Sequence, residues 1–228
     1  MKQSLYDTIA AIITPTGIGG IGVIRISGSQ SLQILTRLTA GRQNIETHRV
    51  VLTKILDQSS KKPIDQALVV YMGAPKTYTG EDVVEISCHG SQFLLQRIID
   101  EIIRCGARQA EAGEFTRRAF VNGKLDLPQA EAILDLVLAR TGRGQELACS
   151  NLEGKLSQRL NEIKGKIIGI LAEIEAGADF PEDVSEVGTT GRLRQIEGVA
   201  EELSSLASEG EQGRIVKEGL RVAISGEL

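Results

Sequence analysis

The residues best placed to bind a charged ligand lie around one turn near the middle of the chain. Arg117, Arg118 and Lys124 supply three cations shortly before an expected helix start. Asp126, with Gln129 three residues later, has the spacing of a capping box, so a helix should begin there. Cationic side chains beside the free N–H groups of a helix N-terminus can bind a carboxylate or a phosphate. The alternative is that these cations are solvated side chains next to a domain boundary.

Two further charged residues interrupt short apolar runs that are typical of strands. Arg25 lies between Ile24 and Ile26, and Glu85 lies within the run 83–88. Because successive strand residues point to opposite faces of a sheet, each charge is expected on the face opposite to its apolar neighbours. The two residues are either exposed surface charges, separate or ion-paired, or part of a polar site.

Several catalytic and nucleotide-binding motifs are absent or do not fit. Residues 17–22 match the pattern G-x-G-x-x-G of dinucleotide sites, but a β-branched strand follows where such a site needs a helix. The patterns G-x-x-x-x-G-K-[ST] and G-x-S-x-G do not occur. Only a helix would align the possible metal ligands Glu81, Asp82, Glu85 and His89. The valines among them favour a strand, so we expect no metal site there. At residues 17–22 we expect a turn.

The first half of the chain alternates strands with helices. Short β-branched runs bounded by turn residues predict strands. They are expected at residues 7–14, 22–27, 49–56, 67–72 and 83–88. Apolar residues at helical spacing predict helices at 31–38 and 93–104. This pattern is typical of an α+β domain, which we expect over residues 1–122.

The second half shows helical patterns only. Apolar residues recur at helical spacing within 128–139, 141–176 and 193–206. The second of these is a single long helix if it is continuous. Together they predict an all-α helical bundle over residues 123–216, whose apolar stripes need a further wall to bury them. Residues 217–228 are similar to the opening strand of another α/β unit, or to a remnant of one.

Composition restricts the function classes. The net charge is -4, so no overall positive field attracts nucleic acid, and an aromatic content of 3% gives few surfaces for base stacking. Cys88, Cys105 and Cys149 are odd in number and far apart, which favours reduced thiols over a disulfide or zinc framework. The sequence shows neither a signal-peptide pattern nor a membrane-spanning run. We expect a cytoplasmic protein that does not contact a membrane.

Five longer motifs occur in the order in which one protein family carries them. They read DTIA, GGIGVIRISG, YTGEDVVE, GEFTRRAF and NGKLDLPQAEA, at residues 7–10, 19–28, 78–85, 113–120 and 122–132. On these motifs the chain resembles the N-terminal and helical portions of the MnmE (TrmE) family of tRNA modification GTPases. The likeness covers nearly the whole chain.

The resemblance implies a fold and a cofactor site. The first domain would have the aminomethyltransferase-like folate-binding fold and would form a homodimer. The family's folate contacts correspond to Arg25, Glu85 and Lys124, and the cofactor would be 5-formyl- or methylene-tetrahydrofolate. The chemistry is consistent, because one carboxylate can accept two hydrogen bonds from the pterin edge while cations hold carbonyl or carboxylate oxygens. The resemblance places no catalytic residue in this chain.

The resemblance also implies the activity of a larger protein. With the flavoprotein MnmG, in a heterotetramer, the family adds a carboxymethylaminomethyl-type group to C5 of the wobble uridine, U34, of certain tRNAs. GTP, Mg2+ and K+ would belong to a GTPase domain that these residues do not include. Two alternatives stay open: a stand-alone folate-dependent one-carbon transferase, and a dimeric scaffold that binds folate or merely carries solvated charges.

Overall fold

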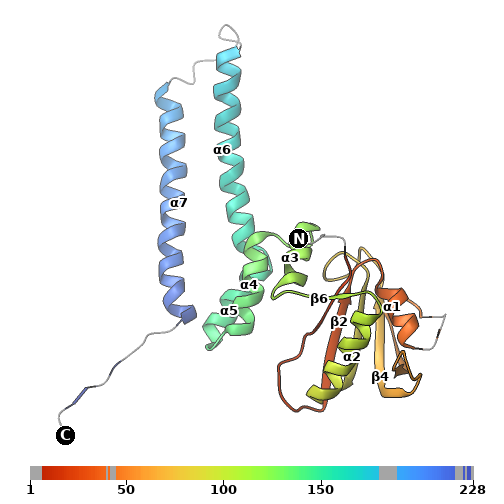
Figure 1. Ribbon diagram of the computed structural model, residues 1–228. Helices are drawn as coiled ribbons and strands as arrows, with labels where there is room; N and C mark the ends of the chain where they lie inside the picture. Colours follow the sequence, from red (N-terminus) through yellow and green to blue (C-terminus); the bar gives the residue numbers. More distant parts are fainter. Residues whose placement is uncertain are drawn as a thin grey trace. The chain divides into compact units, whose positions relative to one another are not determined.

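The computed structural model describes residues 7–39, 41, 45–179, 189–218, 223 and 225–226. The chain divides into two compact units, Met1–Leu125 and Asp126–Leu228. The division falls after Leu125, whereas the sequence predicts a boundary after residue 122. A mixed domain of strands and helices therefore precedes a helical domain, as the sequence predicts (Figure 1).

One six-stranded sheet forms the frame of the first unit. Its strands are β1 (Ile9–Ile12), β2 (Ile21–Ser27), β3 (Arg49–Leu56), β4 (Pro63–Met72), β5 (Val83–His89) and β6 (Arg108–Gln109). They lie in the order β3-β4-β5-β2-β1-β6, and all neighbours are antiparallel except β1 and β6, which are parallel. Each of the five predicted strands is present, with shifted ends in four of them.

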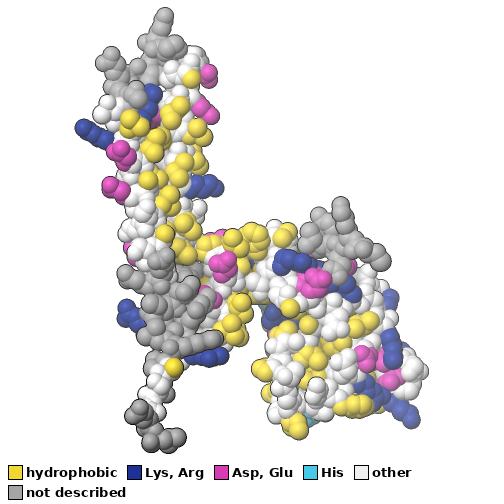
Figure 2. All heavy atoms as spheres, turned by 60° about the vertical axis from the view of Figure 1, so that its left-hand side comes forward, with side chains coloured by type: hydrophobic (Ala, Val, Ile, Leu, Met, Phe, Trp, Pro, Cys, Tyr) yellow, Lys and Arg dark blue, Asp and Glu magenta, His cyan; other side chains and the backbone are white. Residues whose placement is uncertain are grey.

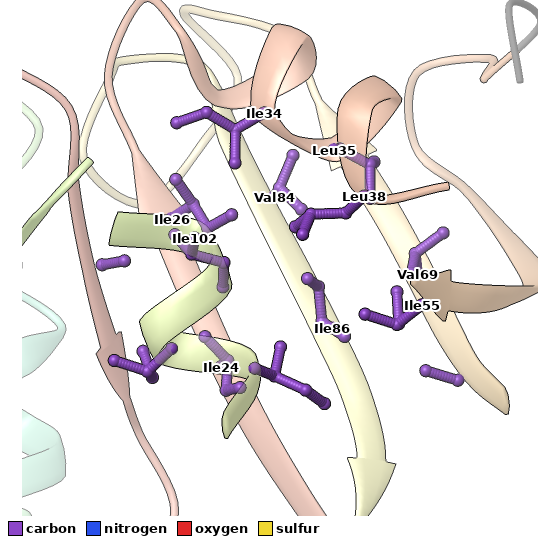
Figure 3. Packing of buried hydrophobic residues seen from close by; sticks show 14 of the residues in the cluster. Ile24, Ile26, Ile34, Leu35, Leu38, Ile55, Val69, Val84, Ile86 and Ile102 are labelled. Carbon is purple, nitrogen blue, oxygen red and sulfur yellow. The ribbon is translucent and has the colours of Figure 1, made fainter. Parts of the chain in front are cut away.

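Helices α1 (Ser31–Leu38) and α2 (Gln92–Arg104) pack on one face of this sheet (Figure 3). Alternate strand residues point to that face and pack against apolar side chains of both helices; among them are Ile24, Ile26, Val84 and Ile86. Burying one such side chain contributes roughly 1.5–3 kcal/mol relative to leaving it exposed. The core also fixes the strand register, because a shift by one residue would turn these side chains to the other face.

The opposite face of the sheet carries the two charges that interrupt the apolar runs. Arg25 of β2 lies directly opposite Glu85 of β5, and Glu85 lies opposite Val70 of β4. In the next row of the same face, Leu52 of β3 lies opposite Leu68 of β4, and these two residues are 54% and 46% exposed. The alternation predicted for Arg25 and Glu85 is therefore confirmed.

Over its described residues the second unit is helical. Its helices are α4 (Leu127–Leu138), α5 (Gly142–Leu152), α6 (Lys155–Asp179) and α7 (Thr189–Glu218). The capping box predicted at the start of α4 is confirmed. Asp126 accepts a hydrogen bond from the backbone N–H of Gln129, and the Gln129 side chain accepts one from the N–H of Asp126.

Residues 141–176 do not form one continuous helix, so the condition for a single long helix is not met. The chain leaves helical geometry between α5 and α6, where Gly154 has a φ of +92°. A left-handed residue ends an α-helix, and glycine adopts this conformation without a steric penalty. Leu152 and Leu156 keep helical spacing across the break, so apolar periodicity does not reveal it.

Helices α6 and α7 lie side by side (Figure 1). The ion pairs Arg159–Glu209 and Lys166–Glu202 join them, and the opposite order of the partners shows that the helices are antiparallel. Hydrophobic side chains follow the surface of the pair (Figure 2). They line a groove formed by Ile167, Ile170, Leu171, Ile174, Ile196, Val199, Ala200 and Leu203.

Some expectations concern short or undescribed parts of the chain. Two short elements, β6 and α3 (Glu114–Val121), are present where the sequence predicts none. Most of 217–228, the expected start of another unit, lies outside the described residues. No helix in the described parts of the chain combines the length and the apolar content needed to cross a bilayer.

Candidate functional site

Arg25 and Glu85 form an ion pair in the middle of the sheet. Arg25 Nε donates a hydrogen bond to Glu85 Oε1 at 2.9 Å, and Arg25 Nη2 lies 2.7 Å from the same oxygen. The pair follows from the antiparallel register of β2 and β5, which places the two residues opposite each other. Their side chains are 20% and 27% exposed, so a ligand can reach both.

Two aromatic rings flank the Arg25 guanidinium. Its Cζ atom lies 5.0 Å from the ring centre of Tyr78 and 5.5 Å from that of Phe115, which are cation–π distances. Tyr78 belongs to the irregular segment 73–82 between β4 and β5, and its hydroxyl lies 2.8 Å from Thr116 Oγ1 of α3. The rings restrict the orientations that Arg25 can adopt.

Lys124 contacts the same segment 73–82. Its Nζ donates to the carbonyl oxygen of Pro75 at 3.0 Å, and a Cβ atom added to Gly80 would lie 3.3 Å from Lys124 Cγ. Gly80 has a φ of +78°, so a side chain there would be strained as well as crowded. Lys124 and Arg25 therefore both contact one short segment of the chain, and the sequence-predicted charges gather around it.

A buried ion network lies beside this segment. Arg118 of α3 is 1% exposed and pairs with Asp7, Glu81 and Glu114. Arg108 contacts both carboxylate oxygens of Glu114 and both of Asp7. Its hydrogen bond holds the pKa of Glu114 at about 2, against an ordinary 4.5, and also lowers the pKa of Asp7.

The anion site considered for Arg117, Arg118 and Lys124 is wrong as a unit. Arg118 is buried in ion pairs, and Arg117 lies 3.5 Å from a carboxylate oxygen of Glu111. The Asp126 side chain already accepts a hydrogen bond from the start of α4. The carboxylates that neutralise Arg118 include two that lie far away in the sequence, so a local pattern cannot show them. Arg117 is 48% exposed but is paired with Glu111 and Glu114, whereas the exposed ammonium of Lys124 donates to the neutral carbonyl of Pro75.

Residues 17–20 of the glycine-rich segment lie between β1 and β2, and residues 21–22 begin β2, so the prediction that the segment opens no helix is confirmed. Gly19 N–H donates to the carbonyl oxygen of Gly90 at 3.1 Å. A Cβ atom on Gly90 would lie 2.4 Å from Gly19 O, so only glycine fits there. Gly90 therefore allows the backbone at Gly19 to approach it closely within the first unit.

The remaining candidate residues show no catalytic arrangement. Within the described ranges, no three or more His, Cys, Asp or Glu side chains are placed to hold a metal ion. His89 Nδ1 lies 2.8 Å from Asp65 Oδ1, while the His89 ring is 74% exposed. Cys88, Cys105 and Cys149 form no disulfide in the described part of the chain. Burial raises the pKa of Cys88 to about 11, so this thiol stays protonated near neutral pH.

The residues around the segment 73–82 can bind an organic anion that also presents hydrogen-bond donors. Glu85 supplies carboxylate acceptors, while Arg25 and Lys124 supply cationic donors. Tyr78 and Phe115 add flat apolar surface. Alternation and clustering single out the three charges, but the contributions of both rings depend on tertiary contacts that no local pattern predicts.

Two family profiles match consecutive parts of the chain. The profile described as "GTP-binding protein TrmE N-terminus" matches residues 8–124, and the profile described as "MnmE helical domain" matches residues 127–221. The range that the first profile matches includes Arg25, Glu85 and Lys124. The junction between the two matches lies next to the division between the two compact units.

Among curated proteins, the chain is similar to several with the name "tRNA modification GTPase MnmE". It is 45% identical to the protein of Moorella thermoacetica, 43% to that of Acetivibrio thermocellus and 39% to that of Staphylococcus aureus. Each comparison covers 97% of this chain and 49% of the relative. The chain therefore spans about half the length of these relatives.

Proposed function

The chain belongs to the MnmE family of tRNA modification GTPases, and on this premise we propose that its first unit binds a reduced folate through Arg25, Glu85 and Lys124. The observation that carries the proposal is the partly exposed Arg25–Glu85 pair on the sheet face opposite α1 and α2. Lys124 contacts the segment whose Tyr78 lies over the Arg25 guanidinium.

Glu85 is the residue proposed to recognise the pterin ring. The ring presents a 2-amino group beside a ring N–H, and one carboxylate can accept a hydrogen bond from each. Both contacts from Arg25 are made to Glu85 Oε1, so Oε2 can accept from a ligand. Arg25 holds the carboxylate in place and offers its remaining N–H groups to a carbonyl oxygen.

Lys124 is the residue proposed to hold an acidic group of the ligand. In the structure its ammonium donates to the neutral carbonyl of Pro75, at an exposed position. A hydrogen bond to a carboxylate is roughly twice as strong as one between neutral groups, so the glutamate tail of a folate would compete for this ammonium. The cofactor is 5-formyl- or methylene-tetrahydrofolate in this proposal, and the unit has an aminomethyltransferase-like fold.

The larger protein of which such a chain forms part is proposed to modify tRNA. Its relatives carry the words tRNA modification GTPase in their names. By that relationship the protein acts with MnmG, in the cytoplasm, to add a carboxymethylaminomethyl-type group to C5 of U34. GTP, Mg2+ and K+ would bind in a GTPase domain that neither matched profile describes.

A second copy of this chain is the proposed partner of the first unit. The sheet face with Arg25 and Glu85 also carries exposed apolar side chains on β3 and β4, among them Val50, Leu52 and Leu68. β3 is an edge strand, so its apolar residues can pack against an equivalent strand around a twofold axis. Light scattering should give the mass of a dimer, and a monomer mass at micromolar concentration would contradict this proposal.

Calorimetric titration with 5-formyltetrahydrofolate tests the folate site. The unchanged chain should bind with 1:1 stoichiometry per protomer, and Glu85→Gln and Lys124→Ala should each weaken binding by about tenfold or more. Glu46→Gln is the matched control for the first variant, because Glu46 is also paired with an arginine but is 69% exposed on another part of the unit. Equal affinities for the unchanged chain and both site variants would show that the assignment is wrong.

A further inference from the structure

The segment 73–82 is attached along its length to α3 and the residues that follow it. Four side chains from that part of the chain reach it. They form the contacts Tyr78 Oη–Thr116 Oγ1 (2.8 Å), Arg118 Nη1–Glu81 Oε1 (3.1 Å), Asn122 Nδ2–Thr79 O (2.7 Å) and Lys124 Nζ–Pro75 O (3.0 Å). The placement of Tyr78 over Arg25 therefore depends on α3 as well as on the neighbouring strands.

Arg118 is the most buried of these four side chains. Its Nη1 donates to the backbone oxygen of Asp7 at 2.7 Å and to both carboxylate oxygens of Glu81 at 3.1 Å. Its Nη2 donates to Asp7 Oδ1 at 2.8 Å and lies 3.4 Å from Glu114 Oε1. One guanidinium thus joins α3, Asp7 two residues before the start of β1, and the segment 73–82.

Glu81, which pairs with Arg118, also contacts β2. Ser27 Oγ donates to Glu81 Oε2 at 2.7 Å and lies 2.7 Å from Thr79 Oγ1. Ser27 is fully buried and lies two residues after Arg25 on the same strand. A continuous series of contacts therefore runs from Arg118 through Glu81 and Ser27 to the strand that carries Arg25.

The burial of Arg118 has an energetic cost. Within the described part of the chain, its Nε atom is buried without a hydrogen-bond partner. A buried ionic group pays a desolvation penalty that its partners offset only in part, and apolar residues of similar volume often give equal or greater stability. What apolar residues could not supply is the fixed direction of the charged hydrogen bonds to Glu81.

We propose that Arg118 is a positioning residue for the folate site, acting through Glu81 to hold Tyr78 over the Arg25 guanidinium. This inference rests on the proposed folate binding, but the geometry it describes exists without a ligand. Loss of the Arg118–Glu81 pair frees the segment 73–82, so that the ring of Tyr78 no longer restricts the Arg25 guanidinium.

Arg108 provides the matched control. It shares the partners Asp7 and Glu114 with Arg118. Within the described residues its hydrogen bonds and ion pairs go to these two carboxylates and to the backbone oxygen of Gln109, not to the segment 73–82. A purely structural role of the network predicts the same consequences for Arg108→Gln and Arg118→Gln. A positioning role predicts that only Arg118→Gln disturbs Tyr78.

The test uses fluorine NMR of the 228-residue chain labelled with 3-fluorotyrosine. The chain has three tyrosines, so three resonances are expected, and Tyr78→Phe identifies the one from Tyr78. Arg118→Gln and Glu81→Gln should move this resonance towards its position in the urea-unfolded chain, whereas Arg108→Gln should leave it in place. Glu81→Gln keeps the test decisive if Arg118→Gln does not fold, because the Glu81 side chain is 19% exposed and its replacement leaves Arg118 paired with Asp7 and Glu114.

Affinity for 5-formyltetrahydrofolate provides the second measurement. A displaced segment should weaken binding by about tenfold or more in Glu81→Gln, since small misplacements of binding groups have large effects. Arg108→Gln should change the affinity by less than about twofold. An unmoved Tyr78 resonance in Glu81→Gln would overturn the positioning role even if folate binds. A moved resonance in a chain that never binds folate would support the role of Arg118 and Glu81 in placing Tyr78, and would contradict the proposed function.

Discussion

The two units bury their side chains in different ways. The first has a continuous apolar core between its sheet and the helices α1 and α2. In the described part of the second, the buried hydrophobic residues are Ala132, Ala148, Ile163 and Val199, and most are small. Larger apolar residues of α6 and α7, such as Leu171 and Ile196, are about half exposed. The first unit thus has the core of an independent domain, while the second offers apolar helix surface to further contacts.

Their charged residues differ in the same way. The side chains of Arg118 and Glu114 in the first unit are each 1% exposed, whereas those of Arg159 and Glu209 in the second are 48% and 54% exposed. Buried ion pairs require defined geometry, and removing one partner strongly destabilises the protein because the other charge stays buried and unpaired. Exposed pairs gain little because water screens them. The comparison indicates that the first unit uses buried charge to fix the position of the segment 73–82 and the second uses charge on its surface.

Truncation of apolar side chains should give the largest difference between the two units in the loss of unfolding free energy. Ile86→Ala removes a fully buried side chain from the core and should cost about 2–5 kcal/mol of unfolding free energy. Leu171→Ala removes one that is 51% exposed and should cost less than about 1 kcal/mol. Urea unfolding, followed by hydrogen exchange of the amides in each unit, measures the unfolding free energy that each substitution removes. Equal losses would contradict the comparison and show that the α6–α7 surface is buried in solution.

Acid should weaken the first unit through Glu114. Its folded pKa of about 2 lies below the ordinary 4.5, so its contribution is complete above pH 4.5 and is lost as the pH falls towards 2. The shift corresponds to roughly 3 kcal/mol of unfolding free energy at neutral pH. Glu114→Gln should remove both this stability and its dependence on pH in that range, as thermal unfolding at pH 3 and pH 7 would show. An unchanged slope between the two pH values would exclude the buried network as its source.

The ion pairs between α6 and α7 should have the smallest effects. The Lys166–Glu202 pair is 54% and 38% exposed, so a double-mutant cycle with Lys166→Ala and Glu202→Ala should give a coupling of about 0.2–1 kcal/mol. Added salt should reduce this coupling further. A coupling as large as that of a buried pair would remove the distinction between the units.

The secondary structure of the chain was largely predictable, because strongly periodic segments determine it locally. β-branched alternation locates β2 to β5, and the capping box of Asp126 and Gln129 locates the start of α4. Elements with little apolar periodicity were missed: β6 has two residues, and α3 carries its charges on a buried side. The break at Gly154 was missed because the apolar spacing continues across it.

The candidate site was predictable only in part. Alternation gives the face on which Arg25 and Glu85 lie, but the register that makes them partners is a property of the folded sheet. Arg118 has a sequence context typical of a solvated cation. Its partners Asp7 and Glu81 are 111 and 37 residues away, and their contact depends on the tertiary fold.

The central claim is that a reduced folate binds beside the Arg25–Glu85 pair, and chemical-shift mapping tests it most directly. Backbone amide spectra of the chain, recorded during addition of 5-formyltetrahydrofolate, report where the ligand binds. The account predicts saturable shifts that are largest for Arg25, Tyr78, Glu85 and Lys124, with the amides of α6 and α7 unchanged. Saturable shifts confined to other residues, or none at millimolar ligand, would contradict it.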